Sequence, residues 1–416
     1  MTTLWDTTGA DIVKALAEQR RIGGAVFSGM ALTLVVIADE GKVVEAEQAA
    51  AAAAAQHPCR ILVVVRRQID APIPRLDAEV LVGGRLGPGE AVVMRMYGRL
   101  GLHAESVVVP LLAADVPVVS WWHGAPPQRL ATDALAVTAD RRITDCSLAA
   151  DPLAALRERA DDYAPGDTDL VWTRSTPWRA VLTSTLDAVA ARRADPFRLI
   201  GGRIEGDPAH PTAALLAGWL SARCGCAIEV VGFARIAGST GVGAVSLDIG
   251  SGEQVRVQAD HRGRAVISQP CRPDSTVALP ARSLGELLRE ELRRLDPDEP
   301  YGQSLEAATG RTGLSDRSPV RQYIWVDPAG DSNDDRGGRA ASRRPSTPGL
   351  GDVPGLDEAG SMVAKSKDAD PLHRGGGMNG RAKVSSSRES ARGPRIVRLL
   401  PGDSGYHDCA RLQPVG

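Results

Sequence analysis

The sequence predicts an α/β protein with two folded domains and a disordered C-terminal tail. Two continuous apolar, β-branched runs, residues 31–39 and 60–66, are typical of strands buried on both faces of a parallel sheet. The Ala- and Glu-rich segment 45–56 between them favours a helix, and this alternation of strand and helix predicts an α/β fold. From about residue 226 the strands become short and alternating, which predicts a more antiparallel second sheet.

The first 150 residues supply an N-terminal mixed, partly parallel sheet with helices. Besides the two buried strands, we expect a helix at 10–21, a hairpin at 76–98, a short apolar helix at 103–115 and strands at 117–122 and 134–146. These elements predict an N-terminal α/β domain over residues 1–150.

A second, α+β-like domain is expected over residues 151–309. Its first helix begins at Asp151, a good N-cap followed by Pro at the first helical position. The later elements are expected to be a helical segment at 166–193 with a kink near Pro177, a strand at 195–206, a helix at 211–225, four or five short strands within 226–280 and two helices within 283–308. Asp167 and Asp169 fit the cap and acidic first turn of a helix.

The region from residue 310 to residue 416 lacks hydrophobic periodicity and is rich in Gly, Ser, Arg and Asp. Such a composition buries too little apolar surface to offset the entropy of the chain. We therefore expect a disordered tail over 310–416.

The composition excludes several classes of protein. A formal net charge of −2 gives no electrostatic basis for binding nucleic acid or an acidic membrane. No apolar run approaches the roughly 20 residues of a membrane span, and the N-terminus lacks the features of a secretory signal. The six Cys residues are too scattered for a disulfide framework. These features predict a cytoplasmic protein with reduced thiols.

The sequence offers no recognisable catalytic or cofactor motif. A P-loop is missing, and the Gly-rich string at 238–243 has the wrong glycine order for a dinucleotide site and favours a hairpin turn. The string GDSGYH at 402–407 imitates a protease nucleophile loop, but it lies in the expected tail, away from a rigid sheet. No nucleophile, base and orienting group can be assembled from the other residues. We predict no enzyme activity, no cofactor, and neither catalytic nor metal-binding residues.

Two adjacent tryptophans end the strand expected at 117–122, in a chain with seven Trp, five Tyr and three Phe. Neighbouring side chains of a strand point to opposite faces, so Trp121 and Trp122 cannot share one pocket. One ring is expected in the core and the other at a crevice or a partner surface, with His123 beside it. The alternative is that both rings are buried, one on each face of a sheet covered by helices.

Basic side chains form a second candidate surface. Arg141 and Arg142 lie close to Asp145 near the end of an expected strand. Paired guanidinium groups can hold a phosphate, and with Arg60 they could form a phosphate site at the carboxyl ends of the sheet. A network of ion pairs at the domain boundary would explain the same residues without a ligand.

Cys224 and Cys226 are the most suggestive pair of thiols. They suit a structural role, a redox-responsive pair or half of a metal site. No second His or Cys pair with metal-ligand spacing follows, and only Arg223 is available to lower a thiol pKa. The pair is a candidate redox site.

Several strings taken together resemble one protein family. They are SVVVPLLAADVPVVSWW (106–122), RRITD (141–145), GDTDLVWTRSTPWRAVLTS (166–184), LAGWLSAR (216–223) and LRRLDPDE (292–299). In this order they resemble OpcA, the glucose-6-phosphate dehydrogenase assembly proteins of actinobacteria and cyanobacteria. The resemblance spans about residues 1–308, although family members commonly carry Ser where this chain has Cys59.

The resemblance implies a non-catalytic partner of glucose-6-phosphate dehydrogenase, acting at the entry of the oxidative pentose phosphate pathway. An outward-facing Trp would anchor the interface, because Trp is enriched where binding energy concentrates. The candidate interface residues are Trp121, Trp122, His123, Arg141, Arg142 and Asp145. A function of a different class, a phosphosugar-binding regulatory module that uses Arg60, Arg141 and Arg142, is the alternative. The sequence leaves the protein's own oligomeric state open.

Overall fold

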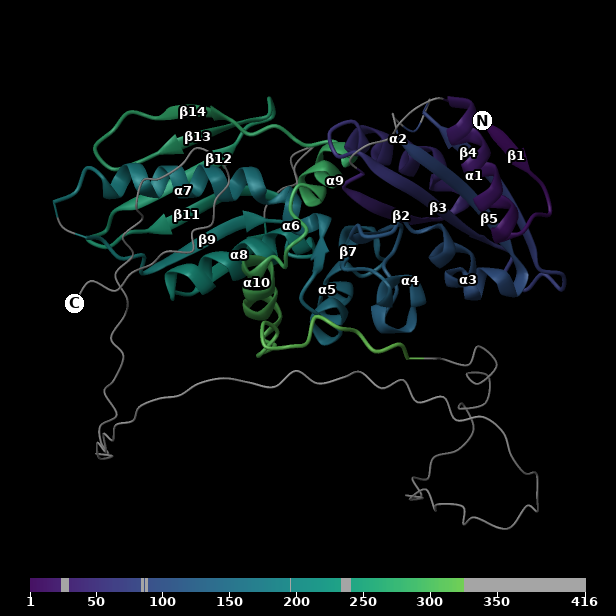
Figure 1. Cartoon of the computed structure of the whole chain (residues 1–416). Helices are drawn as coiled ribbons and strands as arrows, with labels where there is room; N and C mark the ends of the chain where they lie inside the picture. The colour runs from purple at the N-terminus through teal and green to yellow at the C-terminus, as the bar shows by residue number, and fades with distance from the viewer. Residues whose placement is uncertain (24–29, 84–85, 87–88, 195, 233–240, 325–416) are drawn as a thin grey trace, which may run out of the picture. The chain divides into compact units, whose positions relative to one another are not determined.

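The computed structural model describes residues 1–23, 30–83, 86, 89–194, 196–232 and 241–324, which form two sheets with helices (Figure 1). The expected tail from residue 325 onward, the string at 402–407 and the first half of the turn at 238–243 lie outside these residues. The α/β class is confirmed, with a mostly parallel first sheet and a mostly antiparallel second sheet.

The first sheet has eight strands in the order β1-β4-β5-β3-β2-β6-β7-β8. Their bounds are Thr2–Leu4 (β1), Leu32–Ala38 (β2), Cys59–Arg67 (β3), Arg75–Val82 (β4), Glu90–Tyr97 (β5), Val118–His123 (β6), Arg141–Thr144 (β7) and Asp167–Asp169 (β8). The six strands from β5 to β8 in this order run parallel. β4 and β1 continue the sheet as antiparallel strands.

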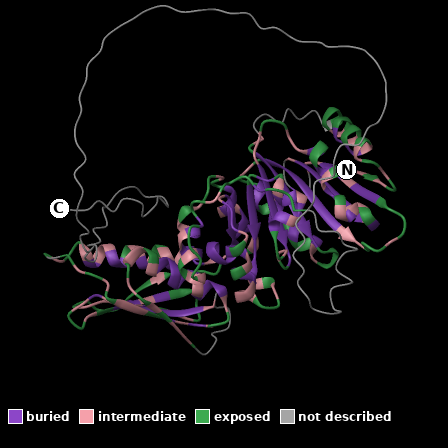
Figure 2. Cartoon of the chain, turned by 90° about the horizontal axis from the view of Figure 1, so that it is seen from below, coloured by how far each residue is buried: buried purple, intermediate pink, exposed green. Residues whose placement is uncertain are grey.

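Helices cover both faces of this sheet, which explains its β-branched strands. The covering helices are α1 (Gly9–Gly23), α2 (Val43–Ala54), α3 (Glu105–Val108), α4 (Ala134–Val137) and α9 (Leu284–Leu292). One face forms a core with α2 and α9, and the other face forms a core with α1, α3 and α4. Figure 2 shows the buried residues concentrated in these strands.

The second sheet has six strands in the order β10-β9-β11-β12-β13-β14. Their bounds are Gly201–Gly206 (β9), Ile228–Gly232 (β10), Val242–Asp248 (β11), Gln254–Ala259 (β12), Arg264–Ser268 (β13) and Ser275–Ala278 (β14). Among the described strands of this second sheet, only β10 and β9 pair in parallel.

One face of the second sheet is apolar, because each of its inner strands contributes aliphatic side chains to it. Ile204, Val245, Val257 and Ile267 lie side by side across four strands. They share a core with helices α5 (Pro152–Asp161), α6 (Leu170–Arg174), α7 (Thr176–Ala190), α8 (Pro211–Cys224) and α10 (Glu299–Thr309).

The first sheet and the core beside it include elements from late in the chain. Leu287, Leu288 and Leu292 of α9 belong to the core beneath α2. β8 extends the sheet past residue 150. The division into residues 1–150 and 151–309 stays a proposal about sequence blocks, since these later segments share the first sheet and its core.

Two segments differ from the sequence-based expectation. Residues 134–137 form a short helix before β7, because Asp133 caps it by accepting a hydrogen bond from the Leu135 amide. Residues 311–324, expected to belong to the tail, pack on the folded chain instead. Leu314 is fully buried, and Arg321 is paired with Asp162 after α5 and with Asp167 at the start of β8. The tail boundary expected at residue 310 was therefore too early.

Candidate functional site

The six parallel strands follow the strand order of a doubly wound dinucleotide-binding sheet. Numbered along the chain, β5-β3-β2-β6-β7-β8 is the order 3-2-1-4-5-6. In such sheets ligands bind beyond the carboxyl ends of the strands, where the strand order reverses. That point lies between β2 and β6, so the residues after Ala38 and around His123 occupy the position of a ligand site in such sheets.

Acidic side chains gather at this switch point. Asp39 and Glu40 directly follow β2, and Glu45 lies in the first turn of α2. His123 Nε2 at the end of β6 lies 3.1 Å from Glu45 Oε2, so this contact joins β6 to α2. A Cβ atom on Gly124 would lie 3.2 Å from Asp39 Oδ2, so the backbone after β6 also approaches an acid closely.

These charges oppose the binding of a phosphate. In dinucleotide-binding sheets, a Gly-rich turn and a helix N-terminus present backbone N–H groups to the pyrophosphate. Here Asp39 and Glu45 lie beside the N-terminus of α2. Their carboxylates, in place of a phosphate, supply the negative charge that the positive end of the helix dipole favours. The His123 side chain is 4 % exposed and packs 5.1 Å from the Trp121 ring. The switch point therefore carries several carboxylates, of which Glu40 is paired with Arg67 and Arg95, and it is partly filled by the protein's own side chains.

A second acidic cluster lies at the carboxyl ends of β7 and β8. Asp169 is completely buried and accepts hydrogen bonds from Thr144 Oγ1 at 2.7 Å and the Val171 amide at 2.9 Å. Burial raises the pKa of Asp169, and the negative charge of Asp145 raises it further. A raised carboxyl pKa can mark a general acid or base. Because Asp169 is 0 % exposed and is bound to its own strands and to α6, it holds the sheet together rather than facing a substrate.

The tryptophan pair is buried on both faces of the sheet. β6 ends at the carboxyl edge, as expected, but Trp121 is 0 % exposed and Trp122 is 4 % exposed. Trp121 packs with the α2 and α9 core, and Trp122 with the α1, α3 and α4 core. The expectation of one outward-facing ring was wrong, because helices cover both faces of the sheet.

The arginines at β7 form internal ion pairs. Arg141 donates hydrogen bonds to Glu291 and, at 2.8 Å, to the Asp296 carbonyl oxygen. Arg142 is paired with Asp167. The structure therefore shows the ion-pair network that was the alternative to a phosphate site. Arg141 and Arg142 are 3 % and 2 % exposed.

Asp145 and Arg60 are also engaged by other parts of the chain. Asp145 holds Arg174 through two hydrogen bonds of 2.8 and 2.6 Å. Arg60 is bound to Glu90 and lies three strands away from Arg141, roughly 14 Å across the sheet. Arg60, Arg141 and Arg142 begin their strands, so they lie at the amino edge and not at the expected carboxyl edge. The three arginines do not form one phosphate site.

The two cysteines flank the end of α8. Gly225 takes a left-handed conformation with φ of 66° and ends the helix between them. Burial raises the pKa of the Cys226 thiol, which lowers the fraction of reactive thiolate at neutral pH. Redox sensitivity of the pair stays a prediction.

The described part of the chain also bears on metal binding and on membrane insertion. Within it, no group of three His, Cys, Asp or Glu side chains is placed to hold a metal ion. None of its helices combines the length and the apolar character needed to span a bilayer.

The chain matches two family descriptions that are adjacent along the sequence. Residues 50–161 match the glucose-6-phosphate dehydrogenase subunit N-terminal domain of OpcA. Residues 165–305 match the C-terminal domain of the same subunit family. The chain belongs to the OpcA family. The resemblance inferred from the sequence strings is thereby confirmed.

Other comparisons add little to the OpcA assignment. No curated protein matches the chain. Among solved structures, an oxidoreductase from Sinorhizobium meliloti is 9 % identical with a TM-score of 0.35, over 72 % of this chain and 100 % of that chain. An inositol dehydrogenase homolog from Azotobacter vinelandii, complexed with NADH and myo-inositol, is 11 % identical with a TM-score of 0.31, over 70 % and 91 % of the two chains. At TM-scores this low, neither similarity indicates a function for this chain.

Among the described tryptophans of this OpcA-family chain one is exposed, and sequence reasoning passed over it. Trp5 is 70 % exposed, whereas the other Trp residues in the described ranges are at most 7 % exposed. Its backbone is fixed, because β1 pairs with β4 and the Asp6 amide donates a 3.0 Å hydrogen bond to Asp77 Oδ1. The sequence signal that could have identified Trp5 as exposed is its position outside any apolar run.

Proposed function

We propose that this protein is a non-catalytic assembly and activation factor for glucose-6-phosphate dehydrogenase, and that it thereby supports the oxidative pentose phosphate pathway. The observation that carries the proposal is the match of both OpcA domains, in order, over residues 50–305. An activating partner requires a surface that recognises the dehydrogenase and needs no reaction centre of its own.

The electrostatics of the switch point support the non-catalytic part of the proposal. A dehydrogenase with this strand order would hold the pyrophosphate of its cofactor beside the first helix of the sheet. In this chain Asp39 and Glu45 stand there, and His123 is bound to Glu45. Phosphate binding would place negative charges next to these carboxylates, and of the nearby cations Arg67 and Arg95 are already paired with Glu40.

Activation by such a partner needs only a modest preference for one state. If the protein binds the active oligomer of the dehydrogenase more tightly than the inactive form, it shifts the population by that difference. A tenfold activation corresponds to about 1.4 kcal/mol of preferential binding. A contact surface of ordinary size is sufficient.

The test is to mix the purified protein with its cognate glucose-6-phosphate dehydrogenase. We expect no NADP reduction by the protein alone, a rise in the activity of the dehydrogenase on mixing, and a larger or more stable dehydrogenase oligomer by sedimentation. NADP-dependent turnover by the isolated protein would contradict the non-catalytic role. An unchanged dehydrogenase activity and oligomer size would contradict the assembly role.

A further inference from the structure

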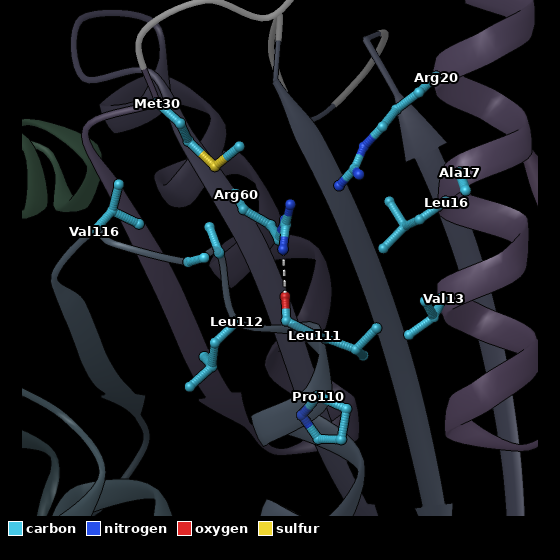
Figure 3. A pocket seen from close by; sticks show the side chains of 12 residues that line it. Val13, Leu16, Ala17, Arg20, Met30, Arg60, Pro110, Leu111, Leu112 and Val116 are labelled. Atoms are coloured by element: carbon cyan, nitrogen blue, oxygen red, sulfur yellow. Dashed lines mark hydrogen bonds between the residues drawn. The ribbon is translucent and has the colours of Figure 1, made fainter. Parts of the chain in front are cut away.

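A cavity of about 400 Å³ opens at the amino edge of the first sheet, opposite the switch point (Figure 3). Its walls come from α1 and from the segment that leads into β6. The larger apolar side chains that line it include Val13, Leu16, Met30, Leu111, Leu112 and Val116. A cavity of this volume lies within the range of small-molecule sites, which are mostly apolar with a few fixed polar groups.

The polar groups of this cavity are two arginines that share one acid. Arg20 reaches in from α1, and Arg60 reaches in from the start of β3 (Figure 3). Arg20 donates two hydrogen bonds to Glu90, one of them 2.7 Å long from Nη2. Arg60 Nε donates to Glu90 Oε2 at 2.9 Å, and Arg60 Nη1 donates to the Leu111 carbonyl oxygen at 2.6 Å. Arg60 is therefore fixed in place, whereas the side chain of Arg20 remains 42 % exposed.

The charges of this trio do not balance. Burial alone would raise the pKa of Glu90, but hydrogen bonds from Arg20 and the charge of Arg60 bring it below its ordinary value. Glu90 is therefore ionised at neutral pH, and two guanidinium groups face one carboxylate. One positive charge is left over at the wall of an apolar cavity.

We propose that this cavity binds a small carboxylic acid with an apolar body of about six to ten carbons. The carboxylate would meet the exposed edge of the Arg20 guanidinium, which matches the geometry of a carboxylate. The apolar body would contact Leu16, Leu111 and Leu112. A phosphosugar fits this chemistry poorly, because its two negative charges exceed the single excess charge and its hydroxyl groups would lie against aliphatic walls.

Such a ligand would connect two parts of the fold. It would bridge α1 and the segment preceding β6, the strand that carries the buried tryptophan pair. A ligand that binds only the folded chain stabilises it by an amount set by its concentration relative to its Kd. This inference is independent of the proposed partner, because it concerns a small molecule and can be tested on the protein alone.

The probe is 3-phenylpropanoate, measured by isothermal titration calorimetry and by the shift in melting temperature. Acetate tests the charge without the apolar body, 3-phenylpropan-1-ol tests the apolar body without the charge, and glucose 6-phosphate tests a phosphosugar. We expect 3-phenylpropanoate to bind at least tenfold more tightly than each of these three. Equal or weaker binding of 3-phenylpropanoate, or no binding at millimolar concentration, would overturn the proposal.

Two variants and their matched controls locate the site. Arg20→Met keeps the length of the side chain and leaves Glu90 paired with Arg60, and we expect it to weaken 3-phenylpropanoate binding at least tenfold. Arg21→Met, on the same helix but paired with Glu18 at the surface, should leave the affinity within twofold. Ala17→Trp should block the cavity, whereas Lys14→Trp on the exposed side of α1 should not. If Arg20→Met and Ala17→Trp both fold and both keep full affinity, the ligand lies elsewhere and the proposal fails.

Discussion

The exposed fractions of the described tryptophans differ by an order of magnitude. The buried rings stabilise the fold, whereas the exposed ring is available for contact with a partner. Trp121 and Trp122 lie in separate cores, whereas Trp5 stands at the surface on a backbone fixed by β4. Sequence alternation established that the adjacent pair points to opposite faces. Whether both faces are covered depends on helices, including α9 from far along the chain, and no local pattern reveals that.

The first prediction compares a buried and an exposed ring. Trp121→Ala should lower the free energy of unfolding by about 3–5 kcal/mol, because it leaves a large cavity. Trp5→Ala should cost less than about 1 kcal/mol, since its ring is mostly in water. If Trp5 contacts the dehydrogenase, the same substitution should weaken activation in a normally folded protein. Urea unfolding and the activation assay measure both effects; a folded Trp5→Ala protein with full activation would place the interface elsewhere.

The second prediction concerns the acid between Arg20 and Arg60. The pKa of Glu90 in the folded chain lies below the value of 4.5 expected in the unfolded chain, so its ionised form stabilises the fold. This stabilisation is complete above about pH 5 and is lost as the pH falls through the folded-state pKa. Glu90→Gln should cost about 3 kcal/mol at pH 7, because Arg60 loses its buried partner. The difference between wild type and variant should shrink below pH 4.5 in urea titrations. A difference that stays constant down to pH 3 would contradict this assignment.

Among the elements, the long and well-capped ones were predictable and the shortest ones were not. β-branched runs predicted β2 and β3, and Ser283 with Glu286 forms a capping box at the start of α9. β1 and β8 have three residues each, too few for an alternating pattern. They are strands because neighbours offer them backbone hydrogen bonds. The expected helix at 103–115 is broken into short helical turns, with Pro110 inside the last of them.

The third prediction tests how closely two helices cross. A Cβ atom on Gly218 of α8 would lie 2.3 Å from the Ser304 carbonyl oxygen of α10, a distance that real contacts do not reach. Gly218→Ala should therefore destabilise the fold by about 1–3 kcal/mol despite the better helix propensity of Ala. Gly41→Ala is the control, because no heavy atom lies within 4 Å of its added Cβ. The melting temperatures of both variants test this prediction. Equal melting temperatures would show that α8 and α10 can move apart at no cost in stability.

For the molecule as a whole, the fourth prediction concerns where the folded chain ends. A chain that stops at Gly310 lacks Leu314 and the ion pairs of Arg321 with Asp162 and Asp167. It should melt roughly 5 °C or more below a chain that stops at Ile324, since burial of one Leu alone contributes about 1.5–3 kcal/mol. Leu314→Ala in the longer chain should reproduce part of the loss. Identical melting curves for the two truncated chains would mean that residues 311–324 contribute nothing to stability.

The position of α9 has a consequence for synthesis on the ribosome. The face of α2 that packs on α9 is complete only after Leu287, Leu288 and Leu292 have been added to the growing chain. At about 5–20 residues per second, that wait is on the order of tens of seconds. During this time the alanine-rich surface of α2 stays open on the nascent chain and is available to chaperones or to aggregation. The N-terminal sheet therefore cannot mature ahead of the second half, and a nascent chain arrested before α9 should be held by chaperones rather than released as a folded domain.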